Sequence, residues 1–197
     1  MSVRMKIMGI LILTGVCVSG QDWADLERYA EANSQLVKDE SGQELVVFIG
    51  NSITQSWPDF HPEFFTENAY IGRGISGQTT PQMLIRFRQD VIDLEPDVVV
   101  ILAGTNDIAG NTGPMTLAQI SGNIFSMCEL AKVNGIQVVL SSVLPAYEYP
   151  WKKEVKPAEK IFRLNQILKQ YAHENDLVYL DYFSAMVDNQ KGLQDNY

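Results

Sequence analysis

The sequence predicts an α/β fold, a three-layer α/β/α sandwich of the flavodoxin-like type with a parallel sheet of about five strands. Several short segments are continuous runs of apolar residues, which is typical of strands buried on both faces of a parallel sheet. The segments between these runs carry apolar residues at helical spacing, so strands and helices alternate as in βαβ units. The length of 197 residues suits one domain.

The first twenty residues are predicted to be a signal peptide and no part of this fold. Basic residues precede the apolar run Ile7–Val18, and the small residues Ser19 and Gly20 follow it, which is the order of a secretory leader. A run of that length is too short to cross a membrane as a helix. We therefore expect a domain over residues 21–197 and no stable membrane span.

The positions of the two cysteines bear on where the protein is exported and on which covalent or metal-binding roles a cysteine can have. Cys17 lies in the leader and follows Val16, whereas lipoprotein processing needs a small residue at that point. Cleavage near Gly20 and export to the periplasm or the exterior are therefore expected, and lipoprotein anchoring is less favoured. Cys128 is then the one cysteine of the domain, which excludes an intramolecular disulfide and a cysteine-based metal site. We expect no cofactor and no metal.

The first half of the domain contains two predicted strands. It opens with a predicted helix over Asp22–Val37, followed by a strand over Leu45–Ile49. A helical stretch and a loop rich in proline and phenylalanine, Pro58–Phe65, lead to a weaker strand, Ala69–Ile71. The next helix is predicted over Thr80–Leu94, because it opens with threonine and proline, which are typical of an N-cap and a first helical turn.

The second half continues the alternation. A strand is predicted over Asp97–Leu102 and a helix over Thr116–Val133, which the pair Asn-Gly ends. A strand over Ile136–Val143, a helix over Pro157–Asn175 and a strand over Leu177–Leu180 follow. This order gives the five strands of the predicted sheet.

Composition excludes two classes of protein. The chain has 24 acidic and 15 basic residues and a net charge of −9, whereas affinity for nucleic acid comes from clustered lysine and arginine. Nucleic acid is therefore not an expected partner. With 46% hydrophobic residues, the chain is also unlike a disordered protein.

Polar and glycine-rich segments follow the first three strands, at the edge where parallel sheets hold their ligands. Gly50–Thr54 places Ser52 before a helix, whose N-terminal N–H groups favour an anion. Gly72–Thr80 contains three glycines that let the backbone approach a ligand closely, and Gly104–Asp107 carries the amide of Asn106. Each segment alone is equally typical of caps and turns.

Taken in order, the three segments resemble those of the SGNH hydrolases, the GDSL-like lipase/esterase family. The resemblance extends over about Leu45–Leu180 and rests on Gly-Asn-Ser-Ile-Thr, Gly-Ile-Ser-Gly-Gln-Thr and Gly-Thr-Asn-Asp. It implies the flavodoxin-like fold and a serine esterase with Ser52 as the nucleophile. It also implies an oxyanion hole formed by the backbone N–H groups of Ser52 and Gly74 and the side chain of Asn106.

The resemblance is incomplete at the C-terminal end. Asn51 and Gly72 replace an aspartate and an asparagine of the family pattern, neither of which belongs to the catalytic triad. The Asp-x-x-His block that supplies the family's general acid and base is absent from this chain. Leu177–Leu193 resembles the segment before that block, so we expect the domain over 21–197 to be C-terminally incomplete, with apolar surface exposed on one sheet face.

The two histidines are not expected to replace the missing base. His61 lies in a loop, and His173 lies off the apolar stripe of its predicted helix, so we expect both to be structural or solvated. The chain as given is therefore expected to be inactive or weakly active.

We expect an exported serine esterase that cleaves small-molecule or carbohydrate esters. O-acetyl groups on carbohydrates, lysophospholipids and thioesters are the substrates considered. The aromatic loop Pro145–Trp151 either walls the substrate site or packs on itself. A catalytically inactive glycan- or lipid-binding protein that retains the pocket is the alternative. A nucleotide-binding flavodoxin relative is disfavoured, because the chain lacks a phosphate-binding motif.

Overall fold

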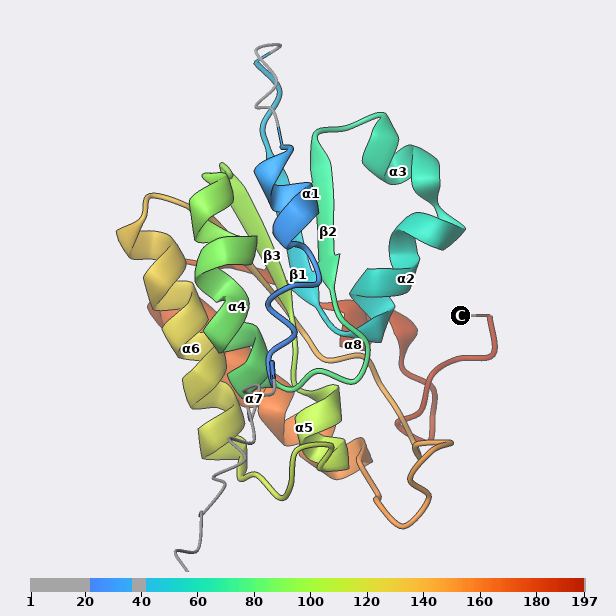
Figure 1. Cartoon of the computed structure of the whole chain (residues 1–197). Helices are drawn as coiled ribbons and strands as arrows, with labels where there is room; N and C mark the ends of the chain where they lie inside the picture. Colours follow the sequence, from blue (N-terminus) through green and yellow to red (C-terminus); the bar gives the residue numbers. More distant parts are fainter. Residues whose placement is uncertain (1–21, 37–41, 197) are drawn as a thin grey trace, which may run out of the picture.

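The computed structural model describes residues 22–36 and 42–196. The predicted signal peptide, residues 1–20, lies outside the described residues. Five parallel strands form one sheet in the order β2-β1-β3-β4-β5, with helices on both sides (Figure 1). The predicted three-layer sandwich is therefore confirmed. Within the described ranges, every helix is too short or too polar to span a membrane.

Each predicted strand is present within a few residues of its expected bounds. The strands are β1 (Val46–Gly50), β2 (Tyr70–Gly74), β3 (Val98–Leu102), β4 (Gln137–Ser141) and β5 (Val178–Leu180). The helices are α1 (Ala30–Ser34), α2 (Ser52–Phe60), α3 (Pro62–Thr66), α4 (Thr80–Asp90), the 3-10 turn η1 (Ile92–Leu94), α5 (Thr105–Ala109), α6 (Leu117–Val133), α7 (Ala158–Glu174) and α8 (Tyr182–Met186).

The two faces of the sheet are covered to different degrees. Side chains alternate along β1, so Val47 and Ile49 pack into the main core with α4, α6 and α7 and are fully buried. Phe48 points to the other face, where its ring meets four aromatic rings of α2, α3 and β2. Val178 of β5, which pairs with Val139 on that second face, is 62% exposed. The second face is therefore the less completely covered one.

The predicted helix over Asp22–Val37 is wrong for most of its length. Only Ala30–Ser34 is helical, no residue of this helix is buried, and no side chain caps its first turn. Asp25 adopts a left-handed conformation with φ of 55°, which interrupts a right-handed helix. Apolar residues at helical spacing do not make a helix here, because the segment is held by polar contacts instead of a buried face.

Pro58–Phe65, predicted as a loop, is largely helical. Pro58 lies inside α2, and Pro62 occupies the first turn of α3, where a missing N–H costs little. The short helices α5 and α8 were not predicted, since five residues carry too little periodicity to recognise.

Candidate active site

Ser52 is the first residue of α2 and follows directly from the end of β1. The buried Asn51 caps the helix, because its side chain accepts a hydrogen bond from Ile53 N at 3.0 Å. The Ser52 side chain is exposed and makes no hydrogen bond to any other residue in the ranges that the structure describes. The hydroxyl therefore stands free at a helix N-terminus, where the backbone favours negative charge.

Asn106 lies at the same edge of the sheet, because β3 runs beside β1 with Gly50 paired to Leu102. It is the second residue of α5 and is 4% exposed. Its Nδ2 donates to the Gln78 carbonyl at 2.9 Å, and within residues 22–36 and 42–196 its second N–H has no other partner. A side-chain amide held at one N–H and open at the other suits an oxyanion donor.

Asp107 fixes the position of α5 relative to α4. Its carboxylate accepts hydrogen bonds from Thr80 N at 2.9 and 3.1 Å and from Thr80 Oγ1 at 2.6 Å. Burial raises the pKa of Asp107, although these hydrogen bonds act in the opposite direction. Asp107 is thus committed to holding the start of α4 and lies beside the site as a structural group.

Gly74 ends β2, and its peptide groups are oriented by the parallel ladder. Ile75 N donates to the Gly50 carbonyl at 3.1 Å, so the N–H and carbonyl of the preceding residue point away from β1. The Gly74 carbonyl accepts a hydrogen bond from the Tyr29 hydroxyl on that outer side. The glycine that the family resemblance implied as an oxyanion donor therefore directs its N–H toward the edge of the sheet.

Gly77 is a second glycine of the same loop, and sequence reasoning did not select it. It has a φ of 77°, is exposed, and accepts a hydrogen bond from Asn111 Nδ2 at 3.1 Å. It directly precedes Gln78, the partner of Asn106. Gly77 and Gln78 thus each accept a hydrogen bond from an asparagine of the segment between β3 and α6, Asn111 and Asn106 respectively. The composition of the loop does not reveal these contacts.

Gly74→Ala is expected to destabilise the fold by about 1–3 kcal/mol, as is usual for overpacking. A Cβ at this position would lie within 2.6 Å of the Asn51 carbonyl oxygen and closer still to Gln55 N, both of which belong to the rigid first turn of α2. Urea unfolding measures the difference. Gly122→Ala is the control. Gly122 lies in α6, and a Cβ there would meet nothing within 4 Å. This substitution is therefore expected to stabilise the fold by about 0.5–1 kcal/mol. Equal effects of the two substitutions would contradict the packing argument.

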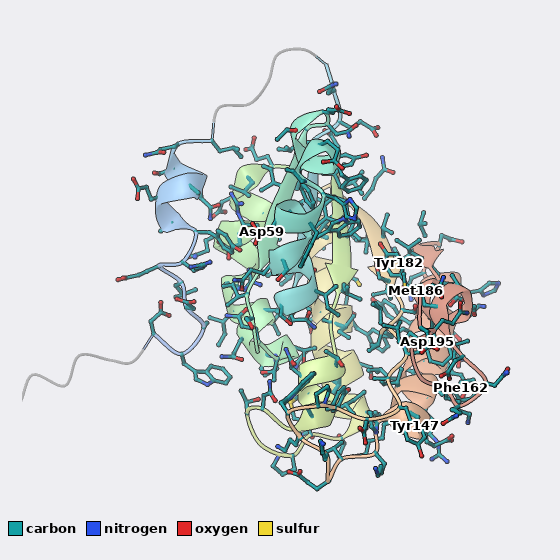
Figure 2. All side chains as sticks on the ribbon, turned by 90° about the vertical axis from the view of Figure 1, so that its right-hand side faces the viewer. Asp59, Tyr147, Phe162, Tyr182, Met186 and Asp195 are labelled. Atoms are coloured by element: carbon teal, nitrogen blue, oxygen red, sulfur yellow. The ribbon has the colours of Figure 1, made fainter. Side chains whose placement is uncertain are left out.

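A cleft of about 410 Å³ contains Ser52 and Asn106. Its other lining residues come from the starts of α2 and α5, the loop after β4 and the C-terminal segment: Ile53, Thr105, Leu144, Pro145, Ala146, Tyr147, Glu148, Tyr149, Pro150, Trp151 and Leu193. Figure 2 shows Tyr147 at the lower edge of this side of the molecule. The predicted aromatic loop thus lines the site of the predicted nucleophile.

The aromatic wall of the cleft is fixed by Tyr149. This residue is 2% exposed, and its hydroxyl lies 2.8 Å from Thr105 Oγ1. Burial raises the pKa of Tyr149 to about 12, so the phenol stays protonated at neutral pH and does not serve as a base. Trp151 stacks on its ring, with a centroid distance of 4.9 Å, and remains 61% exposed.

Both histidines of the chain lie away from Ser52. His61 follows the far end of α2, a helix of nine residues or roughly 13 Å, and its side chain lies 3.6 Å from that of the exposed Glu63. His173 is exposed in the last turn of α7, which leads back from the cleft toward the amino ends of the strands. Within the described parts of the chain, no group of three or more potential ligands could hold a metal ion.

Comparisons with known proteins show the family to which this chain belongs. A family model for the GDSL-like lipase/acylhydrolase family matches residues 48–197. A putative acylhydrolase from Bacteroides fragilis, known from a crystal structure, is 51% identical in sequence to this chain. The two structures align with a TM-score of 0.87, over 90% of this chain and 86% of that chain.

Two curated relatives match over shorter stretches. An arylesterase from Vibrio mimicus is 33% identical over 95 residues, and an uncharacterized lipoprotein from Bacillus subtilis is 32% identical over 81 residues. These stretches make up 46% and 40% of this chain, and the chain spans 46% and 33% of the lengths of those two proteins.

Proposed function

We propose, because this chain belongs to the GDSL-like lipase/acylhydrolase family, that it acts on carboxylic esters through an acyl-enzyme on Ser52. The observation that carries the proposal is the meeting of Ser52 and Asn106 in one cleft. An unbonded hydroxyl at a helix N-terminus and an amide with one open N–H are the groups that acyl transfer needs in close proximity.

In the proposed reaction, Ser52 Oγ attacks the ester carbonyl carbon and its proton passes to a base. The carbonyl oxygen becomes an oxyanion, which the Ser52 N–H and the open N–H of Asn106 stabilise. Collapse expels the alcohol, which takes up the proton, and water then releases the acid and restores the serine.

The third donor of the oxyanion hole comes from the loop after β2. The family resemblance implied Gly74, but the parallel ladder directs its N–H outward. We therefore propose the N–H of Gly77, which lies in the loop that also contacts Asn106 through Gln78. The positive φ of Gly77 supports this role, because it lets the loop turn back toward α5.

Neither of the two histidines of this chain supplies the general base of the proposed mechanism. Both histidines lie remote from Ser52, and the Tyr149 phenol is protonated at neutral pH. We therefore propose that the chain of 197 residues hydrolyses esters slowly and that an external base can substitute.

Hydrolysis of p-nitrophenyl acetate by this chain is expected to be no faster than by a Ser52→Ala variant in a non-nucleophilic buffer. Imidazole can supply the missing base, so the difference between the two proteins is expected to grow with imidazole concentration. Subtracting the Ser52→Ala rate at each concentration removes the catalysis by imidazole itself.

Two results would contradict parts of this proposal. If imidazole never separates the two proteins, and a fluorophosphonate ester also fails to label Ser52, then Ser52 is no nucleophile. A clear Ser52-dependent rate without imidazole would instead show that the chain already contains a base.

The cleft supports a proposal about the substrate. Its wall is apolar and aromatic, and the exposed ring of Trp151 stacks on the fixed ring of Tyr149. A flat exposed ring suits a sugar or acyl group beside the ester. O-acetylated carbohydrate is the substrate class we propose, with lysophospholipid or thioester as the alternative. The leader-like sequence of residues 1–20 supports export.

The remote positions of both histidines also favour a second candidate, an inactive glycan- or lipid-binding protein that retains the cleft. Isothermal titration with xylo-oligosaccharides and with lysophospholipid separates the two. Saturable binding that Trp151→Ala abolishes, together with no Ser52 labelling, would favour the binding protein.

A further inference from the structure

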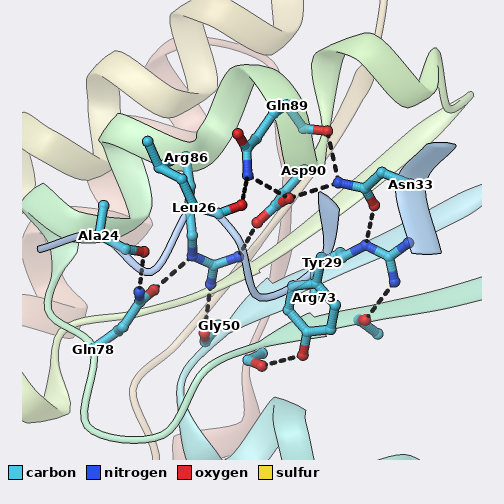
Figure 3. A network of polar contacts seen from close by, with 12 residues as sticks. Ala24, Leu26, Tyr29, Asn33, Gly50, Arg73, Gln78, Arg86, Gln89 and Asp90 are labelled. Atoms are coloured by element: carbon cyan, nitrogen blue, oxygen red, sulfur yellow. Dashed lines mark hydrogen bonds and ion pairs between the residues drawn. The ribbon is translucent and has the colours of Figure 1, made fainter. Parts of the chain in front are cut away.

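The N-terminal segment 22–36 is bound to the rest of the molecule mainly by polar contacts. Ala24 is its only buried residue. Three of its carbonyl oxygens, those of Trp23, Ala24 and Leu26, accept hydrogen bonds of 2.6–2.7 Å from glutamine side chains. These glutamines, Gln82, Gln78 and Gln89, belong to α4 or to the loop before it. Figure 3 shows two of the contacts, Gln78 with Ala24 and Gln89 with Leu26. The segment precedes residue 48, where the family match begins.

Gln78 connects this segment to Asn106. Its side-chain amide donates to the Ala24 carbonyl at 2.7 Å, and its side-chain oxygen accepts a hydrogen bond from Arg86. Its backbone carbonyl accepts the Asn106 amide at 2.9 Å. One buried residue therefore joins the N-terminal segment to the proposed oxyanion donor.

Arg86 extends the network to the strand that precedes Ser52. It is fully buried, and its Nη2 donates to the Gly50 carbonyl at 3.1 Å. Asp90 supports it through an ion pair of 2.9 Å, and the same aspartate accepts a hydrogen bond from Asn33 at 2.8 Å. The contacts of the segment thus extend to the end of β1, before Ser52, and to Asn106 through Gln78.

Tyr29 holds the first residue of the loop that runs from Gly74 to Gln78. Its hydroxyl donates to the Gly74 carbonyl, and the Arg73 guanidinium lies over its ring at 4.8 Å. Arg73 Nε in turn donates to Asn33 Oδ1 at 2.8 Å. The loop from Gly74 to Gln78 is therefore held at both ends by residues 22–36.

We infer that segment 22–36 is a positioning element of the active site. It acts through two positioning residues, Tyr29 of the segment itself and Gln78 of the loop that the segment contacts. An oxyanion hole accelerates acyl transfer only when its donors are held in place before the reaction. Tyr29 holds the start of the loop that contains Gly77, and Gln78 holds the amide of Asn106. The inference rests on the proposed acyl transfer at Ser52.

Tyr29→Phe tests the inference, because it removes one hydroxyl and leaves the ring beneath Arg73. Phosphonylation of Ser52 by a fluorophosphonate ester is measured in imidazole buffer and is followed by the intact mass of the protein. In this reaction the Oγ–P bond forms, fluoride leaves, and imidazole takes up the hydroxyl proton. We expect the maximal rate, kinact, to fall by about five- to tenfold, as for the loss of one hydrogen bond, with KI little changed. The urea midpoint should fall by no more than the loss of that one bond explains. Ser34→Ala is the control, since its hydroxyl bonds only to Glu31 O within the segment, and it should label like the unmodified chain.

An unchanged kinact in Tyr29→Phe would overturn the inference, as would an equal loss in Ser34→Ala. If the unmodified chain does not label even with imidazole present, the proposed function fails, and amide hydrogen exchange then tests the inference separately. Exchange in residues 74–78 should be faster in Tyr29→Phe than in Ser34→Ala, while residues 137–141 of β4 should not differ. Equal exchange in residues 74–78 would overturn the inference independently of activity.

Discussion

Asn106→Ala is expected to lower the rate of Ser52 labelling by a fluorophosphonate ester by about 10²–10³-fold, the usual effect of removing one oxyanion donor. The Asn106 amide is buried, and its contact with the Gln78 carbonyl at 2.9 Å aligns it before any substrate binds. Its loss removes the stabilisation of the developing negative charge, so kinact should fall while KI changes little.

Asn123→Ala is the matched control for this experiment. Asn123 is an amide of the same type that donates to Thr80 Oγ1 at 3.0 Å, but it does not line the cleft. Its substitution should leave the labelling rate within about twofold, a difference of a few tenths of a kcal/mol. Similar losses in the two variants would show that the effect comes from the packing of α4 and α5, and Asn106 would lose its assigned role.

Arg86→Met is expected to lower the free energy of unfolding by about 3–5 kcal/mol, the range for breaking a buried ion pair by removing one partner. The substitution leaves Asp90 as a buried charge and removes the donors to Gln78 and the Gly50 carbonyl. Burial lowers the pKa of Arg86, which its interaction with Asp90 opposes. Urea unfolding at neutral pH measures the loss.

Arg88→Met provides the comparison on the same helix. The Arg88 side chain is 64% exposed and lies 3.6 Å from the Asp93 side chain, which is 56% exposed. Its removal should therefore cost less than about 1 kcal/mol. If the two arginine variants lost the same stability, the ion pair between Arg86 and Asp90 would not be the support that its burial indicates.

The central strands and the positions of Ser52 and Asn106 at their ends could be predicted from the sequence. Leu45–Ile49 and Val98–Leu102 are continuous apolar runs, and they form two neighbouring strands of the sheet. Ser52 and Asn106 follow these strands, so the parallel pairing brings both to one edge. Alternation predicted that both residues lie at the carboxyl edge of the sheet, and the pairing of β1 with β3 brings them into one cleft.

The network around the site was not predictable in the same way. Arg86 and Asp90 are spaced like any exposed helical ion pair, yet both side chains are fully buried in the fold. The choice between Gly74 and Gly77 depends on which peptide group the ladder turns toward β1, and composition does not reveal this register. Long-range polar contacts leave no periodic signal in a sequence.

The polar contacts of segment 22–36 also bear on the behaviour of the protein at high concentration. β2 is an edge strand, and the carbonyls of Gly72 and Gly74 face outward, where another chain could pair with them and begin aggregation. Arg73 Nη1 occupies the first at 2.9 Å, and the Tyr29 hydroxyl occupies the second. This exposed margin of the sheet is thereby closed to edge-to-edge association, while the opposite margin, β5, is only three residues long.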